Sequence, residues 1–291
     1  EGASSSPSSG TPSLCEDIGM CVKQPLFILI TLAYAAYTGG IIGFSTFGPV
    51  LSMDLGFFEE EFEASIFFGG ALAVAGLVGT MLGGLLIDWS LNRYKLRNSE
   101  AREGLIPSEE DSSLSSQGAD QSEESDGTAS VVATMLAFVL NSIGLVCVCG
   151  CIFAQQWVPF FICITIGATF LFASTSAMNL AILESVPRAN RSFAIAFSTL
   201  LMHAFGDVPS PIAVGALKDS IAPDCTPVYS DEGDDTYIPD KCFDDNQQAG
   251  LRMVLVFISA WMALSPLLFG AAWYGARVVR SRFLEKSLNA A

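Results

Sequence analysis

Residues 64–87 read ASIFFGGALAVAGLVGTMLGGLLI, an apolar run without a single charged side chain. A surface helix of a soluble protein would carry a polar face at a period of 3.6 residues, and this run shows no such face. About 20 helical residues cross a hydrocarbon core about 30 Å thick. The run therefore predicts a membrane-spanning helix.

Five more segments of this kind accompany it, so that the predicted spans cover about residues 26–52, 65–89, 130–154, 157–183, 193–218 and 250–276. The composition agrees, because 51% of the 291 residues are hydrophobic and only 15% are charged. A soluble domain usually carries about 25% charged residues. The predicted fold class is an all-α membrane protein with six transmembrane helices.

Basic residues favour the cytoplasmic side of membrane proteins. If the N-terminus is inside, eleven of the fourteen basic residues flank inner ends: Lys23, Arg93, Lys95, Arg97, Arg102, Arg188, Arg191, Arg277, Arg280, Arg282 and Lys286. Both termini are therefore expected in the cytoplasm. The net charge of −16 comes mostly from three polar stretches. It does not indicate nucleic acid as a partner.

Polar segments divide the chain further. Residues 1–24 read as a cytoplasmic linker, because EGASSSPSSGTPS lacks the apolar region of a signal peptide. A chain without a start Met is expected to be a fragment of a longer protein. Residues 98–128 are rich in serine and acids and predict a disordered cytoplasmic loop. That loop reads as a solvated linker or as a target of phosphorylation.

The cysteines indicate one disulfide and no metal. Cys225 and Cys242 share an acidic loop on the predicted outer side, where an oxidising compartment would let them pair. The other six lie in or beside apolar runs and read as small hydrophobes or free thiols. With one histidine in the chain and no paired CxxC motifs, neither a metal site nor a cofactor is expected.

The second span ends GTMLGGLLIDWSLNRYKLR at residues 79–97. Here the chain resembles the major facilitator superfamily, whose loop signature is G-x-x-x-D-[RK]-x-G-[RK]-[RK]. Gly84, Asp88 and Arg93 match it. Three positions depart from it: Trp89, Leu91 and Asn92. The resemblance implies that Asp88 helps to lock the cytoplasmic side; a snorkelling helix end is the alternative. Gly79, Gly83 and Gly84 predict a close helix contact.

The stretch HAFGDVPSPIAVGALKD at residues 203–219 is similar to the eleventh-helix signature of the Spinster branch of that superfamily. The matching positions are His203, Gly206, Asp207, Ser210, Pro211, Gly215 and Asp219. His203 and Asp207 share a helix face, and Pro209 and Pro211 weaken the helix. The pair either fixes helix packing, acts in gating or coupling, or contacts substrate. We expect the face to look into the bundle or a wet cavity, because charges in lipid are costly.

The resemblance assigns the spans to family helices seven to twelve. Residues 25–97 would hold helices seven and eight, and residues 129–280 helices nine to twelve with an outer loop at 219–248; residues 281–291 would form a cytoplasmic tail. Helices seven and ten line the substrate path in this superfamily, which points to five polar residues: Tyr34, Tyr37, Ser45, Thr175 and Asn179. Gly39, Gly40, Gly43 and the Gly48-Pro49 pair would let the first span bend. Glu184 is expected to pair with Arg188.

The resemblance implies the C-terminal six-helix half of a secondary transporter, partnered by an N-terminal six-helix half and the bilayer. A Spinster-like protein would move a lysolipid or sphingolipid by alternating access, in a plasma or endolysosomal membrane. An intramembrane enzyme is the less favoured alternative, because the chain has no HExxH or G-x-S-x-G motif. A membrane scaffold or lipid receptor that does not transport is the other alternative.

Overall fold

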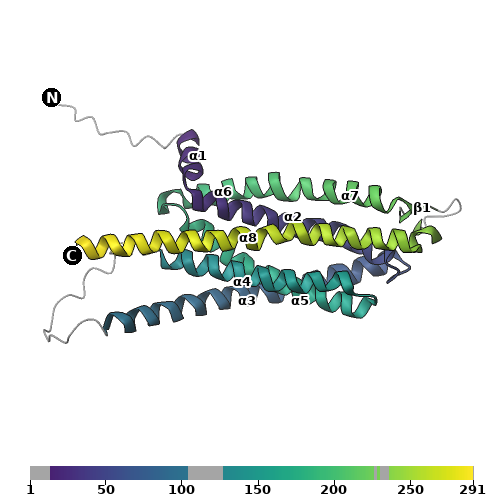
Figure 1. Cartoon of the computed structure of the whole chain (residues 1–291), viewed down its shortest axis with the longest axis horizontal. Helices are drawn as coiled ribbons and strands as arrows, with labels where there is room; N and C mark the ends of the chain where they lie inside the picture. Colours follow the sequence, from purple (N-terminus) through teal and green to yellow (C-terminus); the bar gives the residue numbers. More distant parts are fainter. Residues whose placement is uncertain (1–13, 104–126, 226–227, 230–235, 291) are drawn as a thin grey trace, which may run out of the picture.

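The structure is a computed structural model that describes residues 14–103, 127–225, 228–229 and 236–290. Six helical stretches among these are long and apolar enough to cross a membrane: Pro25–Asp54, Glu61–Tyr94, Thr128–Phe153, Trp157–Glu184, Arg188–Ile221 and Asp245–Lys286. They lie side by side as one bundle, with α1 and the C-terminal end of α8 at one end and β1 at the other (Figure 1). The six predicted spans are therefore present as helices.

The main helices are α1 (Leu14–Lys23), α2 (Pro25–Asp54), α3 (Glu61–Glu103), α4 (Thr128–Gly150), α5 (Trp157–Glu184), α6 (Arg191–Met202), α7 (Pro209–Ile221) and α8 (Asp245–Ala290). Short helical turns are η1 (Cys151–Phe153), η2 (Arg188–Asn190), η3 (His203–Asp207), η4 (Pro223–Cys225) and η5 (Asp240–Phe243). The strands β1 (Val228–Tyr229) and β2 (Thr236–Tyr237) form an antiparallel hairpin that pairs Val228 with Tyr237.

Three boundaries differ from those predicted. Helix α3 continues to Glu103, past the expected loop start at residue 98, because helix-favouring charged residues follow the span. Helix α8 runs through the expected tail to Ala290. Helix α1 occupies the second half of the expected linker. The rest of that linker and residues 104–126 of the acidic loop lie outside the described residues.

Two apolar clusters form the core, one towards each end of the bundle. The cluster near α1 gathers around Phe27, Leu171 and Phe269, and the cluster near the hairpin around Leu51, Phe160 and Leu251. The glycines of α2 lie between these clusters, at a level where α2 and its neighbours cross closely. This middle level is where the polar residues singled out from the sequence lie.

Candidate functional site

The fifth span is not a regular α-helix. Residues His203–Asp207 form one π-helical turn between α6 and α7, and the Val208 backbone N–H donates to the His203 carbonyl at 3.0 Å, five residues back. Pro209 begins α7 without an amide proton to donate. The wide turn accommodates this loss while the helix axis continues. Such π-turns are often found at functional sites.

His203 and Asp207 meet within this turn. The His203 Nδ1 and the Asp207 Oδ2 are 2.5 Å apart, and the side chains are 61% and 20% exposed. The other carboxylate oxygen of Asp207 is buried and has no hydrogen-bond partner among the described residues. The pair predicted from the four-residue spacing is thus brought together, with the imidazole turned outward and one carboxylate oxygen open to a further donor.

Two side chains from other helices approach the pair. The Tyr34 hydroxyl of α2 lies near the Asn179 side chain of α5 and near the Asp207 carboxylate. Asn179 is exposed and Tyr34 is buried. Tyr34, Asn179, His203 and Asp207 form a polar cluster that joins α2, α5 and η3, and we call it the midspan cluster. It offers hydrogen-bond donors and acceptors at a depth where the bundle is otherwise apolar.

The three other predicted path residues donate to backbone carbonyls. The Tyr37 hydroxyl is buried and donates to the Leu171 carbonyl of α5 at 3.1 Å. Ser45 donates to Ile42 at 3.1 Å and Thr175 to Phe172 at 2.7 Å, each within its own helix. Hydroxyls in helices often satisfy carbonyls in this way. Tyr37 therefore fastens α2 to α5, and only Tyr34 and Asn179 join the midspan cluster.

The glycines of α2 let the fifth span approach closely. A Cβ on Gly39 would stand 3.2 Å from the Cα of Gly206, and one on Gly43 would stand 2.5 Å from the Ser210 Oγ. The Ser210 hydroxyl is buried and donates to the Gly39 carbonyl at 2.5 Å. The glycines therefore permit close approach of the fifth span along the continuous helix α2. Sequence reasoning missed this crossing, although its small residues were the available signal.

The loop-signature residues Gly84, Asp88 and Arg93 all lie on α3. Asp88 is exposed, and no ion pair to it occurs among the described side chains. The Arg93 guanidinium lies over the Trp89 ring, 5.1 Å from its centroid. A Cβ on Gly84 would meet nothing within 4 Å, whereas one on Gly83 would stand 2.2 Å from the Ala173 carbonyl oxygen of α5. Of the expected small-residue face, Gly79 and Gly83 contact α5 and Gly84 does not.

The end of the fifth span that lies near α1 is fastened by polar contacts. Glu184 pairs with Arg191 at 2.6 Å; the expected partner was Arg188, and the ion pair instead joins the end of α5 to the start of α6 across the intervening turn. The Asn190 amide donates to the Asp17 carboxylate of α1 at 2.8 Å. Helix α1 is therefore docked where α6 begins.

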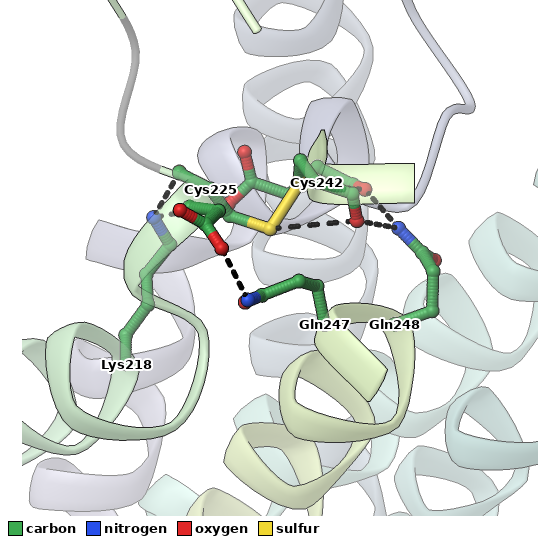
Figure 2. Close-up of a disulfide and its surroundings, with 7 residues drawn as sticks. Lys218, Cys225, Cys242, Gln247 and Gln248 are labelled. Carbon is green, nitrogen blue, oxygen red and sulfur yellow. Dashed lines mark hydrogen bonds and ion pairs between the residues drawn. A yellow bond between two sulfur atoms is a disulfide. The ribbon is translucent and has the colours of Figure 1, made fainter. Parts of the chain in front are cut away.

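At the opposite end, Cys225 and Cys242 are joined by a disulfide. Figure 2 shows Lys218 and Gln248 on two sides of this bond. The described part of the chain holds no group of three or more His, Cys, Asp or Glu side chains arranged to bind a metal ion.

The chain was compared with known proteins. The profile of the Organic Anion Transporter Polypeptide (OATP) family matches residues 4–103 and 118–225. The Arabidopsis thaliana protein described as "Probable sphingolipid transporter spinster homolog 2" is 24% identical over 212 residues, which is 73% of this chain and 36% of that protein. The Mus musculus "Solute carrier organic anion transporter family member 4A1" is 40% identical over 105 residues, 34% of this chain and 13% of that protein.

Two crystal structures of a bacterial homologue of the human lysosomal transporter Spinster have the same fold. One, inward-facing and occupied, gives a TM-score of 0.59 at 15% identity and covers 86% of this chain and 49% of that one. The other, inward-facing and unoccupied, gives 0.60 at 15% identity and covers 92% and 52%. This chain thus spans about half the length of the solved structures and about a third of the plant relative. The resemblance to Spinster proteins and the six-helix half of a major facilitator fold are confirmed, and the chain is an integral multi-pass membrane protein.

Proposed function

Because this chain belongs to the Organic Anion Transporter Polypeptide (OATP) family, we propose that it forms the C-terminal half of a secondary transporter for small amphipathic molecules. The observation that carries the proposal is the midspan cluster. His203 is 61% exposed at its side chain, in a span that is long and apolar enough to cross a membrane. Ionisable groups at membrane depth face a protein partner or a water-filled cavity, since lipid cannot solvate them.

The surface around the cluster suggests a partner. Span α3 and the α6–α7 span are the least buried of the six. Both expose large apolar side chains, among them Leu77, Met81 and Leu85 on α3 and Leu200, Phe205 and Ile212 on α6–α7. Transporters of this architecture join two six-helix halves around a midplane site. We assign the partner of these two spans to an N-terminal six-helix half, so that α2 to α8 serve as helices seven to twelve.

The proposed cycle is alternating access by rocking of the two halves. The midspan cluster would face the cavity between them, with Tyr34 and Asn179 contacting the polar part of the substrate. His203 and Asp207 would act in gating or coupling, and the turn that begins at His203 with Pro209 and Pro211 would let the fifth span flex. Gly84, Asp88 and Arg93 would contact the partner half at the cytoplasmic side.

The substrate is proposed to be a lysolipid or a sphingolipid. The sphingolipid transporter name of the plant relatives supports this, and the family description and the mouse relative extend the class to organic anions. A substrate with an apolar tail and a polar or anionic head suits a cavity that combines apolar walls with the imidazole, amide and phenol of the midspan cluster.

The distribution of Lys and Arg supports cytoplasmic termini, with the disulfide on the opposite, oxidising side. Either a plasma membrane or an endolysosomal membrane provides such a side. Helix α1, packed against the start of α6, would then lie at the cytoplasmic surface and lead from the linker into α2.

The test is transport by the full-length protein in proteoliposomes. Uptake of a fluorescent lysophospholipid, a fluorescent sphingoid base and fluorescein as an organic anion would be compared with empty vesicles. We expect at least one probe to accumulate and Asp207→Asn to abolish its flux. Saturable binding without flux of any probe would support the scaffold or receptor alternative and contradict a transporter. Flux that is unaffected by Asp207→Asn would mean that transport does not depend on the midspan cluster.

A further inference from the structure

A charged pair is buried at the hairpin end of the bundle, away from the midspan cluster. Asp54 is the last residue of α2 and has no exposed surface; Lys218 lies in the last turn of α7 and is 5% exposed. The Lys218 Nζ is 3.1 Å from the Asp54 Oδ2. Helix α2 and the fifth span, which cross at Gly39 and Gly206, are thus joined again at the hairpin end by opposite charges.

The position of Asp54 is unfavourable without this partner. The C-terminus of a helix carries a partial negative charge, which repels a carboxylate, and burial adds the cost of removing it from water. The Lys218 ammonium offsets both effects, because it sits at the C-terminal ends of α2 and α7 together. Removing one partner of a buried pair leaves an uncompensated charge, and this is much more destabilising than removing both.

The pair is linked to the disulfide through backbone carbonyls. Lys218 donates to the carbonyl of Cys225 at 2.8 Å. Gln248, in the first turn of α8, donates to the carbonyl of Cys242 at 3.0 Å and to the carbonyl of Asp54 at 2.7 Å. Figure 2 shows these two donors reaching the disulfide from α7 and α8. The bond between Cys225 and Cys242 therefore fixes both acceptors relative to one another.

We propose that Asp54, Lys218, Gln248 and the Cys225–Cys242 disulfide form one redox-sensitive latch that holds the ends of α2, α7 and α8 together. A reductant that donates two electrons, together with two protons from the solvent, would convert the disulfide into two thiols. The Cys225 carbonyl would then be free to leave Lys218, and the ion pair would lose its fixed geometry. The latch is independent of the proposed transport, because it concerns only contacts within this chain.

The experiment measures the thermal midpoint, Tm, of the purified full chain in detergent, with and without the reductant tris(2-carboxyethyl)phosphine. The variants are Asp54→Asn, Lys218→Met and the double variant. A matched pair at the opposite end, Glu184→Gln and Arg191→Met, serves as control, because its ion pair is partly exposed and has no bond to the disulfide. The rate at which Cys225–Cys242 is reduced is followed by thiol alkylation and mass spectrometry.

We expect Lys218→Met to lower the Tm by about 10 °C and the double variant to recover at least half of that loss. Reductant should lower the Tm of the unmodified chain much more than that of Lys218→Met. In the control variants, reductant should lower the Tm as much as it does in the unmodified chain. Additive effects of Asp54→Asn and Lys218→Met, or an equal response to reductant in all variants, would overturn the latch. If Lys218→Met does not fold, the two charges are exchanged in the double variant Asp54→Lys, Lys218→Asp. Folding of this double variant would support the latch, and failure to fold would contradict it.

Discussion

Gly206 of the π-helical turn lies directly against Gly39 of α2. A Cβ added at Gly206 would stand 3.1 Å from the Gly39 nitrogen and 2.3 Å from the Ala35 carbonyl oxygen. Both obstacles are backbone atoms that cannot rotate away. One turn further along, Ser210 donates to the Gly39 carbonyl. The contact sets the separation of α2 and the fifth span beside the midspan cluster, so the two helices are held closest where their polar side chains meet.

The first prediction is that Gly206→Ala separates these helices. Adding one methyl group against fixed backbone costs about 1–3 kcal/mol of unfolding free energy, so the Tm should fall by several degrees. Gly70→Ala in α3 is the control, because a Cβ there meets nothing within 4 Å and alanine favours the helix. Tm measurements on both variants in detergent would check it. Equal Tm values for the two variants would show that the crossing is not tight.

The second prediction concerns the open oxygen of Asp207. Asp207→Asn keeps the shape of the side chain but removes its charge, so His203 loses its carboxylate partner. If the pair works in gating or coupling, flux in proteoliposomes should fall at least about tenfold, as for loss of one charged hydrogen bond, while the Tm changes little. Glu63→Gln, an exposed carboxylate at the start of α3, should leave both quantities unchanged. Normal flux in Asp207→Asn would favour a packing role.

The six spans could be predicted because hydropathy and length alone decide which segments cross a membrane. His203 and Asp207 could be paired from their four-residue spacing. The partner of Tyr37 could not, since Leu171 is 134 residues away and offers only a backbone carbonyl. The π-turn likewise depends on how α2 crosses the fifth span. The pairing of Lys218 with Asp54 could not be predicted either, because the two residues are distant in sequence and hydropathy records no ion pairs.

The third prediction uses two thiols on α1. Cys15 is exposed and Cys21 is fully buried. Burial raises the pKa of the Cys21 thiol, and the nearby Asp17 carboxylate raises the pKa further. A raised thiol pKa leaves less of the reactive thiolate at neutral pH. N-ethylmaleimide at pH 7.5 should therefore modify Cys21 at least about tenfold more slowly than Cys15.

Mass spectrometry of timed samples would measure both rates in the same molecule. Asp17→Asn removes the smaller cause of the pKa shift and the contact with Asn190, so it should speed the labelling of Cys21 and leave Cys15 unchanged. Equal rates for the two thiols in the unmodified chain would mean that α1 is not docked on the bundle.

The last prediction compares two neighbouring glycines of α3. Gly83 packs on the backbone of Ala173, whereas Gly84 faces open space in this chain. Gly83→Ala should lower the Tm of the isolated chain, because its Cβ would collide with the Ala173 carbonyl. Gly84→Ala should leave that Tm unchanged or raise it slightly. In the full-length protein, however, Gly84→Leu should reduce flux if this face packs against a partner half. Unchanged flux in Gly84→Leu would instead place this face of α3 against lipid, where a larger apolar side chain is harmless.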